Sequence, residues 1–285
     1  MLLNKIKEVR EEVKQWRAKG LKVGLVPTMG ALHEGHLSLI KRAKNECDKV
    51  VVSVFVNPIQ FGPSEDFDKY PRTLEADTKL CDNEGVDIVF APTPREMYGD
   101  DGRLSNDTLT YVCPPFFYVN KLCGKSRVGH FDGVCTVVNK LFNIVQPDVA
   151  FFGQKDAQQV IIIKKMVKDL NIPVEVVQCP IVREESGLAL SSRNKYLSEE
   201  GKKEALVLSS ILNNIKACYK RGITDVSALK ETAYSYLTNK HDMEYLELMD
   251  KDTLEEKTTA DDNTIALIAC RVEGVRLIDN LYLAD

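Results

Sequence analysis

Two neighbouring stretches, GLVPTMGALHEGHLSLI (24–40) and KVVVSVFV (49–56), decide the fold. The first runs from a short apolar strand ending at Pro27 into a helix predicted over about 36–46, whose apolar residues recur every three or four positions. The second is apolar at consecutive positions, which is typical of a strand buried on both sides of a parallel sheet. Strand, helix and buried strand together predict a βαβ unit.

The same alternation continues on both sides of these stretches. Before them, an amphipathic helix is predicted to begin near Leu3 and to end before Gly20, where a left-handed C-cap is expected. After them, further helices are predicted at about 74–84, 132–146 and 156–170, and further strands at 86–91, 148–153 and 174–179. At least five strands in this order predict an α/β fold with an open, doubly wound, Rossmann-like parallel sheet. Binding sites are then expected at the carboxyl ends of the strands.

The pattern changes after Arg183. A polar loop leads to a long helix predicted to open at Ser198, and a second helix is predicted over about 225–238. Three strands are then predicted, at 243–250, 264–270 and 275–283. We therefore expect a Rossmann-like domain over 1–182 and a smaller C-terminal α+β domain over 183–285.

Composition disfavours several classes of protein. The chain has 285 residues, with 38 Lys and Arg against 42 Asp and Glu, and this near-balance argues against a broad nucleic-acid-binding face. No apolar run approaches the roughly 18 residues of a transmembrane helix, and the N-terminus is too charged for a signal peptide. The 8 cysteines form no CxxC pair, so we expect reduced thiols in a cytoplasmic protein.

Chemistry is suggested by His33 and His36, which are two of the 4 histidines and lie where the helix after the first strand should begin. A helix N-terminus presents unpaired N–H groups and a partial positive charge, so it suits phosphate. Imidazoles placed there can donate hydrogen bonds to phosphate oxygens and stabilise charge on a leaving pyrophosphate. The patterns GxxxxGK[ST] and GxGxxG are absent here, which disfavours P-loop and dinucleotide sites.

Two other interpretations of this histidine pair stay open at this point. Histidines three apart could be zinc ligands, although HExxH is absent and His130 and His241 show no matching spacing. The stretch could also be a purely structural turn.

PTMGALHEGH (27–36) resembles the signature of the pantothenate synthetases, also called pantoate–β-alanine ligases, a variant of the HIGH motif of the nucleotidylyltransferase superfamily. HIGH alone is shared with class I aminoacyl-tRNA synthetases and cytidylyltransferases. Four more blocks resemble the family in order and spacing: FVNPIQFGPSEDFDKYPRT (55–73), CGKSRVGHFDGVCTVV (123–138), FFGQKDAQQ (151–159) and VREESGLALSSRN (182–194). The resemblance covers essentially the whole chain and is weakest toward its end.

The resemblance implies a condensation of (R)-pantoate with β-alanine that uses ATP and Mg²⁺. The pantoate carboxylate attacks the α-phosphate to give pantoyl adenylate and pyrophosphate, and the β-alanine amine then attacks the acyl carbon and expels AMP. Such catalysis requires mainly alignment and neutralisation of phosphate charge. The family also implies a homodimer whose partners are these small molecules, with neither nucleic acid nor membrane.

The resemblance further implies which residues form the site. The catalytic residues would be His36, as proton donor, with His33, Lys155 and Arg193. ATP would be bound by three loops and by Val182: Met29, Gly30, Ala31, Leu32, His33, Glu34, Gly35 and His36; Gly153, Gln154, Lys155 and Asp156; and Leu190, Ser191, Ser192 and Arg193.

Two glutamines would hold pantoate by its hydroxyl and carboxylate oxygens, namely Gln60 and Gln159, and Gln60 would also contact β-alanine. An amide suits this task because it offers both a donor and an acceptor. The chain departs from the family at two positions, Gln154 where Glu is common and Leu190 where Met is usual. A polar loop with Arg127, His130 and Asp132 either lines the site or is structural.

Three other functions remain in competition. A nucleotidylyltransferase would transfer AMP or CMP to a phosphorylated acceptor and stop there, but the paired glutamines favour a hydroxy carboxylate over a phosphate ester. A tRNA-binding synthetase fragment is disfavoured by the acidic balance of the chain. A zinc-dependent hydrolase is the third.

Overall fold

The structure is a computed structural model that describes residues 1–63, 65–99 and 109–284. The chain divides into two compact units, each described by itself below. The first unit comprises Met1–Gly153 and Ile162–Cys179, and the second comprises Gln154–Ile161 and Pro180–Asp285.

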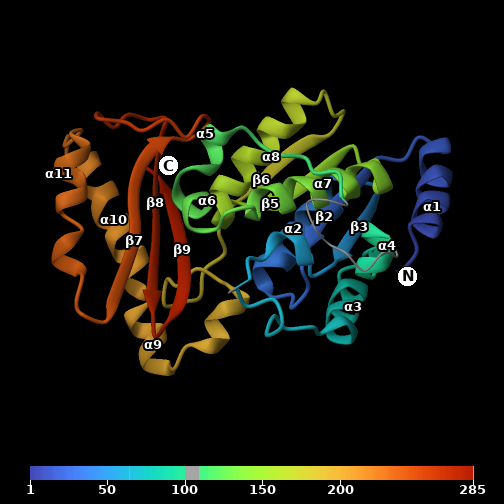
Figure 1. Ribbon diagram of the computed structural model, residues 1–285, viewed down its shortest axis with the longest axis horizontal. Helices are drawn as coiled ribbons and strands as arrows, with labels where there is room; N and C mark the ends of the chain where they lie inside the picture. Colours follow the sequence, from blue (N-terminus) through green and yellow to red (C-terminus); the bar gives the residue numbers. More distant parts are fainter. Residues whose placement is uncertain (64, 100–108, 285) are drawn as a thin grey trace. The chain divides into compact units, whose positions relative to one another are not determined.

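Among the described residues, the first unit holds a parallel sheet with the strand order β1-β4-β3-β2-β5-β6. Figure 1 labels β3, β2, β5 and β6 of this sheet. The strands are β1 (Leu2–Leu3), β2 (Val23–Thr28), β3 (Lys49–Val54), β4 (Ile88–Phe90), β5 (Val149–Gly153) and β6 (Glu175–Cys179). The centre of β3 is fully buried, as its continuous apolar run predicts. Strand order reverses at β2, which pairs with β3 on one side and β5 on the other. The predicted doubly wound fold is confirmed, and β2 ends at its switch point.

Helices of the first unit agree with the predicted periodicity, with shifted ends. The longer ones are α1 (Ile6–Ala18), α2 (Glu34–Glu46), α3 (Leu74–Asn83) and α7 (His130–Val145); α8 (Ala157–Asp169) crosses from one unit to the other. Shorter ones are η1 (Pro58–Gln60), α4 (Pro94–Tyr98), α5 (Phe116–Val119) and α6 (Leu122–Ser126). The predicted helix start at Leu3 is wrong, because Leu3 pairs with Phe90 as part of the edge strand β1. A strand of two residues is too short to show a period in the sequence.

The second unit contains an antiparallel sheet of β7 (His241–Asp250), β8 (Thr264–Val272) and β9 (Val275–Tyr282), in that order. Its helices are α9 (Glu199–Glu204), α10 (Leu206–Lys220) and α11 (Val226–Glu231), with the short turns η2 (Gln154–Asp156), η3 (Ser192–Tyr196) and η4 (Tyr234–Tyr236). The three predicted strands are confirmed, and Ile211 and Ile215 of α10 are buried in one core with Ile268 of β8.

Both predicted helices of the second unit differ in extent from the structure. Ser198 caps α9 as expected, but the helix is interrupted at Ala205 before α10. The sequence pattern extends the next helix to residue 238, whereas α11 ends at Glu231. There the Thr232 hydroxyl donates to the Leu229 carbonyl (2.7 Å), and such a local bond competes with continuation of the helix.

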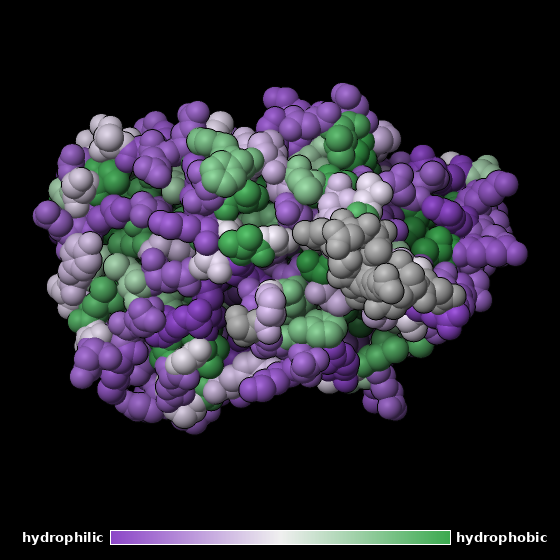
Figure 2. All heavy atoms as spheres, viewed as in Figure 1, coloured by the Kyte–Doolittle hydropathy of each residue, from purple (hydrophilic) through white to green (hydrophobic). Residues whose placement is uncertain are grey.

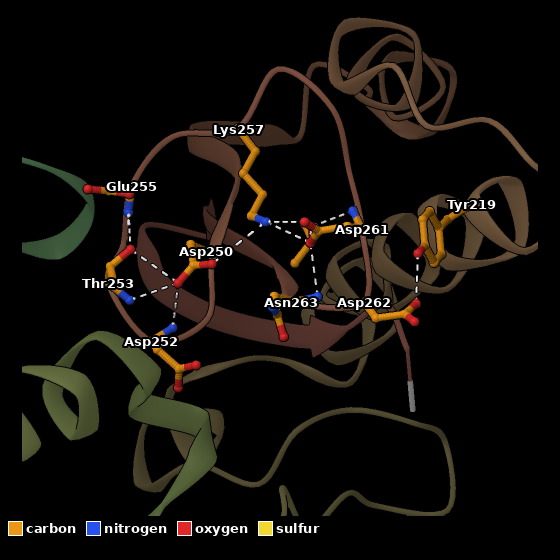
Figure 3. A network of polar contacts seen from close by, with 10 residues as sticks. Tyr219, Asp250, Asp252, Thr253, Glu255, Lys257, Asp261, Asp262 and Asn263 are labelled. Atoms are coloured by element: carbon orange, nitrogen blue, oxygen red, sulfur yellow. Dashed lines mark hydrogen bonds and ion pairs between the residues drawn. The ribbon is translucent and has the colours of Figure 1, made fainter.

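The loop between β7 and β8 carries a polar network at the surface of the second unit (Figure 3). Asp250 accepts hydrogen bonds from the backbone N–H groups of Asp252 (3.1 Å) and Thr253 (3.0 Å). Lys257 forms an ion pair with Asp261 (2.6 Å). We call residues 250–263 the β7–β8 loop.

Two further observations concern the chain as a whole. Within the described ranges, no helix is both long enough and apolar enough to cross a membrane. The 8 cysteines are free thiols, and Cys113 is exposed while the others are buried. Burial raises the pKa of the Cys81 and Cys135 thiols to about 12, which keeps them protonated and unreactive at neutral pH.

Candidate active site

The loop between β2 and α2 ends in a histidine cap. His33 is the N-cap of α2, and its Nδ1 accepts from the Gly35 N–H (3.1 Å), while the His33 N–H donates to Nδ1 of His36 (3.3 Å). The two rings lie 4.1 Å apart between centroids. Because both Nδ1 atoms accept, the neutral rings carry their protons on Nε2. Each histidine can therefore donate through Nε2 at the N-terminus of a helix.

A buried carboxylate shapes the same loop from inside. Asp77 on α3 is 1% exposed and accepts from the Ala31 N–H (3.0 Å) and the Leu32 N–H (2.8 Å). The backbone turns through positive φ at Gly30 and Ala31, and a Cβ atom at Gly30 would lie 2.9 Å from Asp77 Oδ2. Two amides of the predicted ATP loop are therefore already bonded to Asp77, which holds the loop in shape.

Gln60 lies at the end of η1, beyond the carboxyl end of β3, as expected. Its side chain is 7% exposed, and its Oε1 accepts from Asn57 Nδ2 (3.0 Å). Asn57 Nδ2 also donates to the Gly133 carbonyl (3.1 Å), and the Tyr98 hydroxyl donates to Asn57 Oδ1 (2.6 Å). Gln60 Nε2 lies 3.1 Å from the sulfur of Met29. In the first unit, Gln60, the residue predicted to bind pantoate, thus contacts Met29 of the loop predicted to bind ATP.

Arg127 before α7 and His130 at the start of α7 support the backbone of Gln60. The predicted loop placement of His130 and Asp132 is wrong, because α7 begins at His130. Arg127 makes a bidentate ion pair with Glu65 (2.7 Å for both contacts) and also lies 2.9 Å from Nε2 of His130. Arginine has no acceptor, so His130 Nε2 accepts and its Nδ1–H donates to the Gln60 carbonyl (2.8 Å). Of the two roles left open for His130, the structure shows this supporting contact.

The contacts of Arg127 also set the pKa of Glu65. Burial alone would raise the pKa of Glu65, but the hydrogen bonds and charge of Arg127 outweigh it, so that pKa lies below its ordinary value. Burial raises the pKa of Asp132, which lies on the first turn of α7.

In the second unit, β9 fixes the turn that carries Lys155. Asn280 is 1% exposed, and its Nδ2 donates to the backbone carbonyls of Gln154 (2.9 Å) and Lys155 (3.0 Å). The Gln154 side chain donates in return to Asn280 Oδ1 (3.2 Å). The family departure at Gln154 therefore has a structural use, because its amide supplies a donor that a carboxylate lacks.

The neighbouring residue of β9 fixes the second predicted phosphate loop. Asp279 receives a bidentate contact from Arg183 (2.7 and 2.9 Å), and the Leu190 N–H donates to the Val182 carbonyl (3.0 Å). Lys155 and Ser191 line one cavity of about 10 Å³, which is room for about one water molecule. The second unit thus places these two residues, both predicted to bind ATP, in the wall of one cavity.

The predicted site residues consequently lie in two sets. Met29 to His36, Gln60 and Gly153 belong to the first unit, and the second contains Gln154, Lys155, Asp156, Gln159, Val182 and Leu190 to Arg193. Gln159 is partly buried and lies on the first turn of α8, within the helix predicted over about 156–170. That the two sets form one active site stays a prediction. Across the described residues, no group of three His, Cys, Asp or Glu side chains could hold a metal ion.

The chain matches known proteins over its full length. A sequence profile described as Pantoate-beta-alanine ligase matches residues 1–282. The chain belongs to the pantoate-beta-alanine ligase family. The pantothenate synthetase of Clostridium novyi is 54% identical to it over 280 residues, which are 98% of this chain and 96% of that protein.

Two solved structures of the family are similar to this one. The pantothenate synthetase of Thermus thermophilus has a TM-score of 0.92 and 42% identity, over 100% of this chain and 99% of that one. The pantoate-beta-alanine ligase of Francisella tularensis, complexed with beta-gamma ATP and beta-alanine, has a TM-score of 0.77 and 35% identity, over 100% and 98% of the chains.

Sequence reasoning about the family motifs missed the residues that hold the site in place. They are Asn57, Asp77, Tyr98, Gly133, Asp279 and Asn280. Signals existed for three of them: Asn57 and Gly133 lie within the quoted blocks 55–73 and 123–138, and Asp77 lies four residues before Cys81 on the buried face of a helix. A carboxylate on a buried helix face needs hydrogen-bond donors, because an unpaired buried charge is costly. For Asp77 these donors are backbone N–H groups of the ATP loop.

Proposed function

We propose that the chain condenses (R)-pantoate with β-alanine at the expense of ATP, giving pantothenate, AMP and pyrophosphate through pantoyl adenylate. The observation that carries the proposal is the histidine-capped N-terminus of α2 at the switch point of a doubly wound sheet, in a chain that matches the family end to end. Such a helix end suits the triphosphate of ATP.

In the first step, His33 and His36 donate hydrogen bonds through Nε2 to phosphate oxygens and stabilise the charge of the departing pyrophosphate. Proton donation by His36, as the family implies, requires its imidazolium form, in which Nδ1 gives up the contact with the His33 N–H. Lys155 and Arg193 neutralise phosphate charge, with the hydroxyls of Ser191 and Ser192 as further donors. Mg²⁺ enters with ATP as part of the nucleotide substrate and supplies charge neutralisation on its phosphates. The other ATP contacts are Met29 to Gly35, Gly153, Gln154, Asp156, Leu190 and the Val182 backbone at adenine.

Gln60 and Gln159 hold pantoate so that its carboxylate faces the α-phosphate. In the second step β-alanine, also contacted by Gln60, attacks the acyl carbon with its amine and AMP departs. Alignment does most of the work, because the adenylate already contains a good leaving group. We assign ATP and pantoate binding to residues 1–182, and closure over the phosphates to 183–285.

We further propose that the chain is a cytoplasmic homodimer that acts on small molecules and uses neither nucleic acid nor membrane. Large apolar side chains exposed at the surface support self-association: Phe116 and Phe117 on α5 are 77% and 44% exposed, and Val128 before α7 is 90% exposed. Figure 2 shows hydrophobic residues in green between the hydrophilic ones on this face. Sedimentation of the wild type and of Phe116→Ser tests this: the wild type should be a dimer, and the variant should shift toward monomer.

The experiment that tests the reaction separates its two steps. ATP, Mg²⁺ and pantoate alone should release pyrophosphate, and AMP should turn over only once β-alanine is added. His241→Ala is a matched control, since His241 belongs to β7 and pairs with Glu204 (3.2 Å). Pyrophosphate release without pantoate dependence would contradict the assignment of the substrate and point to nucleotidyl transfer onto another acceptor.

A further inference from the structure

A buried chain of hydrogen bonds holds the amide of Gln60 in one orientation. The chain begins at the backbone carbonyl of Gly133, which can only accept a hydrogen bond. The Asn57 atom that lies 3.1 Å from this carbonyl must therefore be the amide nitrogen, Nδ2. Asn57 is 1% exposed, so the orientation of its amide is set by protein atoms.

The orientation of Asn57 determines what its two neighbours do. With Nδ2 turned to Gly133, Oδ1 faces the Tyr98 hydroxyl at 2.6 Å, and that hydroxyl must donate. Burial, together with the neighbouring Tyr111, raises the pKa of Tyr98, so the hydroxyl keeps its proton. The Gln60 atom 3.0 Å from Asn57 Nδ2 must be an acceptor, which identifies it as Oε1.

Gln60 consequently turns its nitrogen away from Asn57. Nε2 lies 3.1 Å from the Met29 sulfur, and a thioether has no proton to donate, so this contact requires the same orientation. The backbone of Gln60 is held separately by His130, whose Nδ1 lies 2.8 Å from the Gln60 carbonyl. A weak sulfur acceptor is readily exchanged for an oxygen acceptor of a ligand.

We propose that Tyr98 is a positioning residue that locks Gln60 through Asn57, so that Gln60 presents N–H donors and withholds its carbonyl from the substrate. The group it recognises is an acceptor oxygen, as in the carboxylate or a hydroxyl lone pair of a hydroxy acid. This inference rests on the proposed function, which places pantoate on Gln60. The sequence alone allows the Gln60 amide to bind pantoate as a donor and as an acceptor. The proposal restricts it to the donor role.

The first test is Tyr98→Phe in the full chain, which removes one oxygen and leaves Asn57 Oδ1 without this donor. We expect the KM for pantoate to rise about tenfold, the effect of one lost hydrogen bond. The KM for ATP and kcat at saturating pantoate should stay within about twofold, because this hydroxyl reaches the ATP loop only through the weak contact of Gln60 with the Met29 sulfur. An unchanged pantoate KM, or equal rises for pantoate and ATP, would overturn the proposal.

Tyr219→Phe is the matched control for this variant. Its hydroxyl also donates to a side-chain oxygen, that of Asp262 (2.9 Å), but in the second unit at the β7–β8 loop (Figure 3). It should leave the KM for pantoate unchanged. A rise as large as that of Tyr98→Phe would mean that the assay reports general loosening, and the positioning role would be rejected.

A second test separates a donor from an acceptor at Gln60. Gln60→Glu offers only acceptor oxygens at neutral pH, whereas Gln60→Ala offers neither kind of group. If Gln60 binds through N–H, Gln60→Glu should raise the KM for pantoate at least about tenfold more than Gln60→Ala, because it sets a carboxylate against the substrate's carboxylate. Tighter pantoate binding by Gln60→Glu than by Gln60→Ala would overturn the proposal.

The wild-type chain is measured first in the same assay. Absence of pantoate-dependent pyrophosphate release would contradict the proposed function itself. Normal release by the wild type, combined with an unaffected Tyr98→Phe variant, would reject only the role of Tyr98.

Discussion

Two polar networks, one in each unit, differ in what surrounds them. The network of Tyr98, Asn57 and Gln60 in the first unit is shielded, with Asn57 and Gln60 1% and 7% exposed. The network of the β7–β8 loop is open to water: the Asp261 side chain is 55% exposed, although that of its partner Lys257 is only 16% exposed (Figure 3).

The comparison shows that a count of contacts does not measure their importance. In the shielded network a lost partner leaves a buried polar group unpaired, at a cost of about 1–3 kcal/mol of stability. It also lets the amide of Gln60 turn out of the single orientation that the network imposes. In the open network water replaces the lost partner, and ion pairs of this kind add little. Function should therefore depend on the first network and tolerate changes in the second.

The largest expected effects come from the reacting groups rather than from either network. His36→Ala and Lys155→Ala should each slow pantoate-dependent pyrophosphate release by at least about 100-fold, because each removes a donor to phosphate charge. Their melting temperatures should stay close to that of the wild type, since both side chains are partly exposed. Near-normal release by either variant would remove that residue from the catalytic group.

Gly133→Ala should disrupt the shielded network through a steric clash. A Cβ atom there would lie 2.4 Å from the Ile59 carbonyl oxygen and 2.6 Å from Gln60 Cα, so α7 and η1 would have to separate. We expect a loss of about 2–3 kcal/mol in the free energy of unfolding, measured by urea denaturation, together with a raised KM for pantoate. In the control Gly62→Ala the nearest atom is 3.7 Å away, and the loss should be much smaller.

A pH series on Glu65→Gln tests the ion pair that supports Gln60 from the other side. Because the pKa of Glu65 is lowered in the folded chain, its stabilising contribution is complete above its ordinary value of 4.5 and is lost as pH falls through the lowered pKa. The melting temperature of the wild type should therefore exceed that of Glu65→Gln at pH 7, and the difference should shrink below about pH 4.5. A constant difference over that range would show that the charge of Glu65 is not responsible.

The smallest effect is expected in the open network. Lys257→Ala removes the ion pairs to Asp250 (3.6 Å) and Asp261 (2.6 Å), yet it should shift the melting temperature by about 2 °C or less, as measured by calorimetry. Pantothenate formation should be unchanged. A shift as large as that of Gly133→Ala would remove the distinction between the two networks.

Local pattern accounts for most of what could be predicted. Two patterns predicted the doubly wound sheet: the continuous apolar run of β3 and the apolar residues that recur every three or four positions in α2 and α7. A strand buried on both faces is apolar throughout, and a helix buried on one face is apolar at that spacing, so both can be recognised in the sequence. The predicted end of α11 was wrong because the hydroxyl of Thr232 bonds to a backbone carbonyl there, and apolar periodicity does not reveal such a local contact. The edge strand β1 failed because it exists only by pairing with β4.

The sequence by itself determined the fold class, the family and the residue types offered for catalysis, since these follow from periodicity and from motifs of adjacent residues. Only the tertiary structure decided how those residues are held. Gly133 and Tyr98 orient Asn57 from 76 and 41 residues away, and Asp77 grips Ala31 from 46 residues away. The direction of a hydrogen bond depends on which buried group faces it, and residues so far apart in the chain meet only when the sheet has formed.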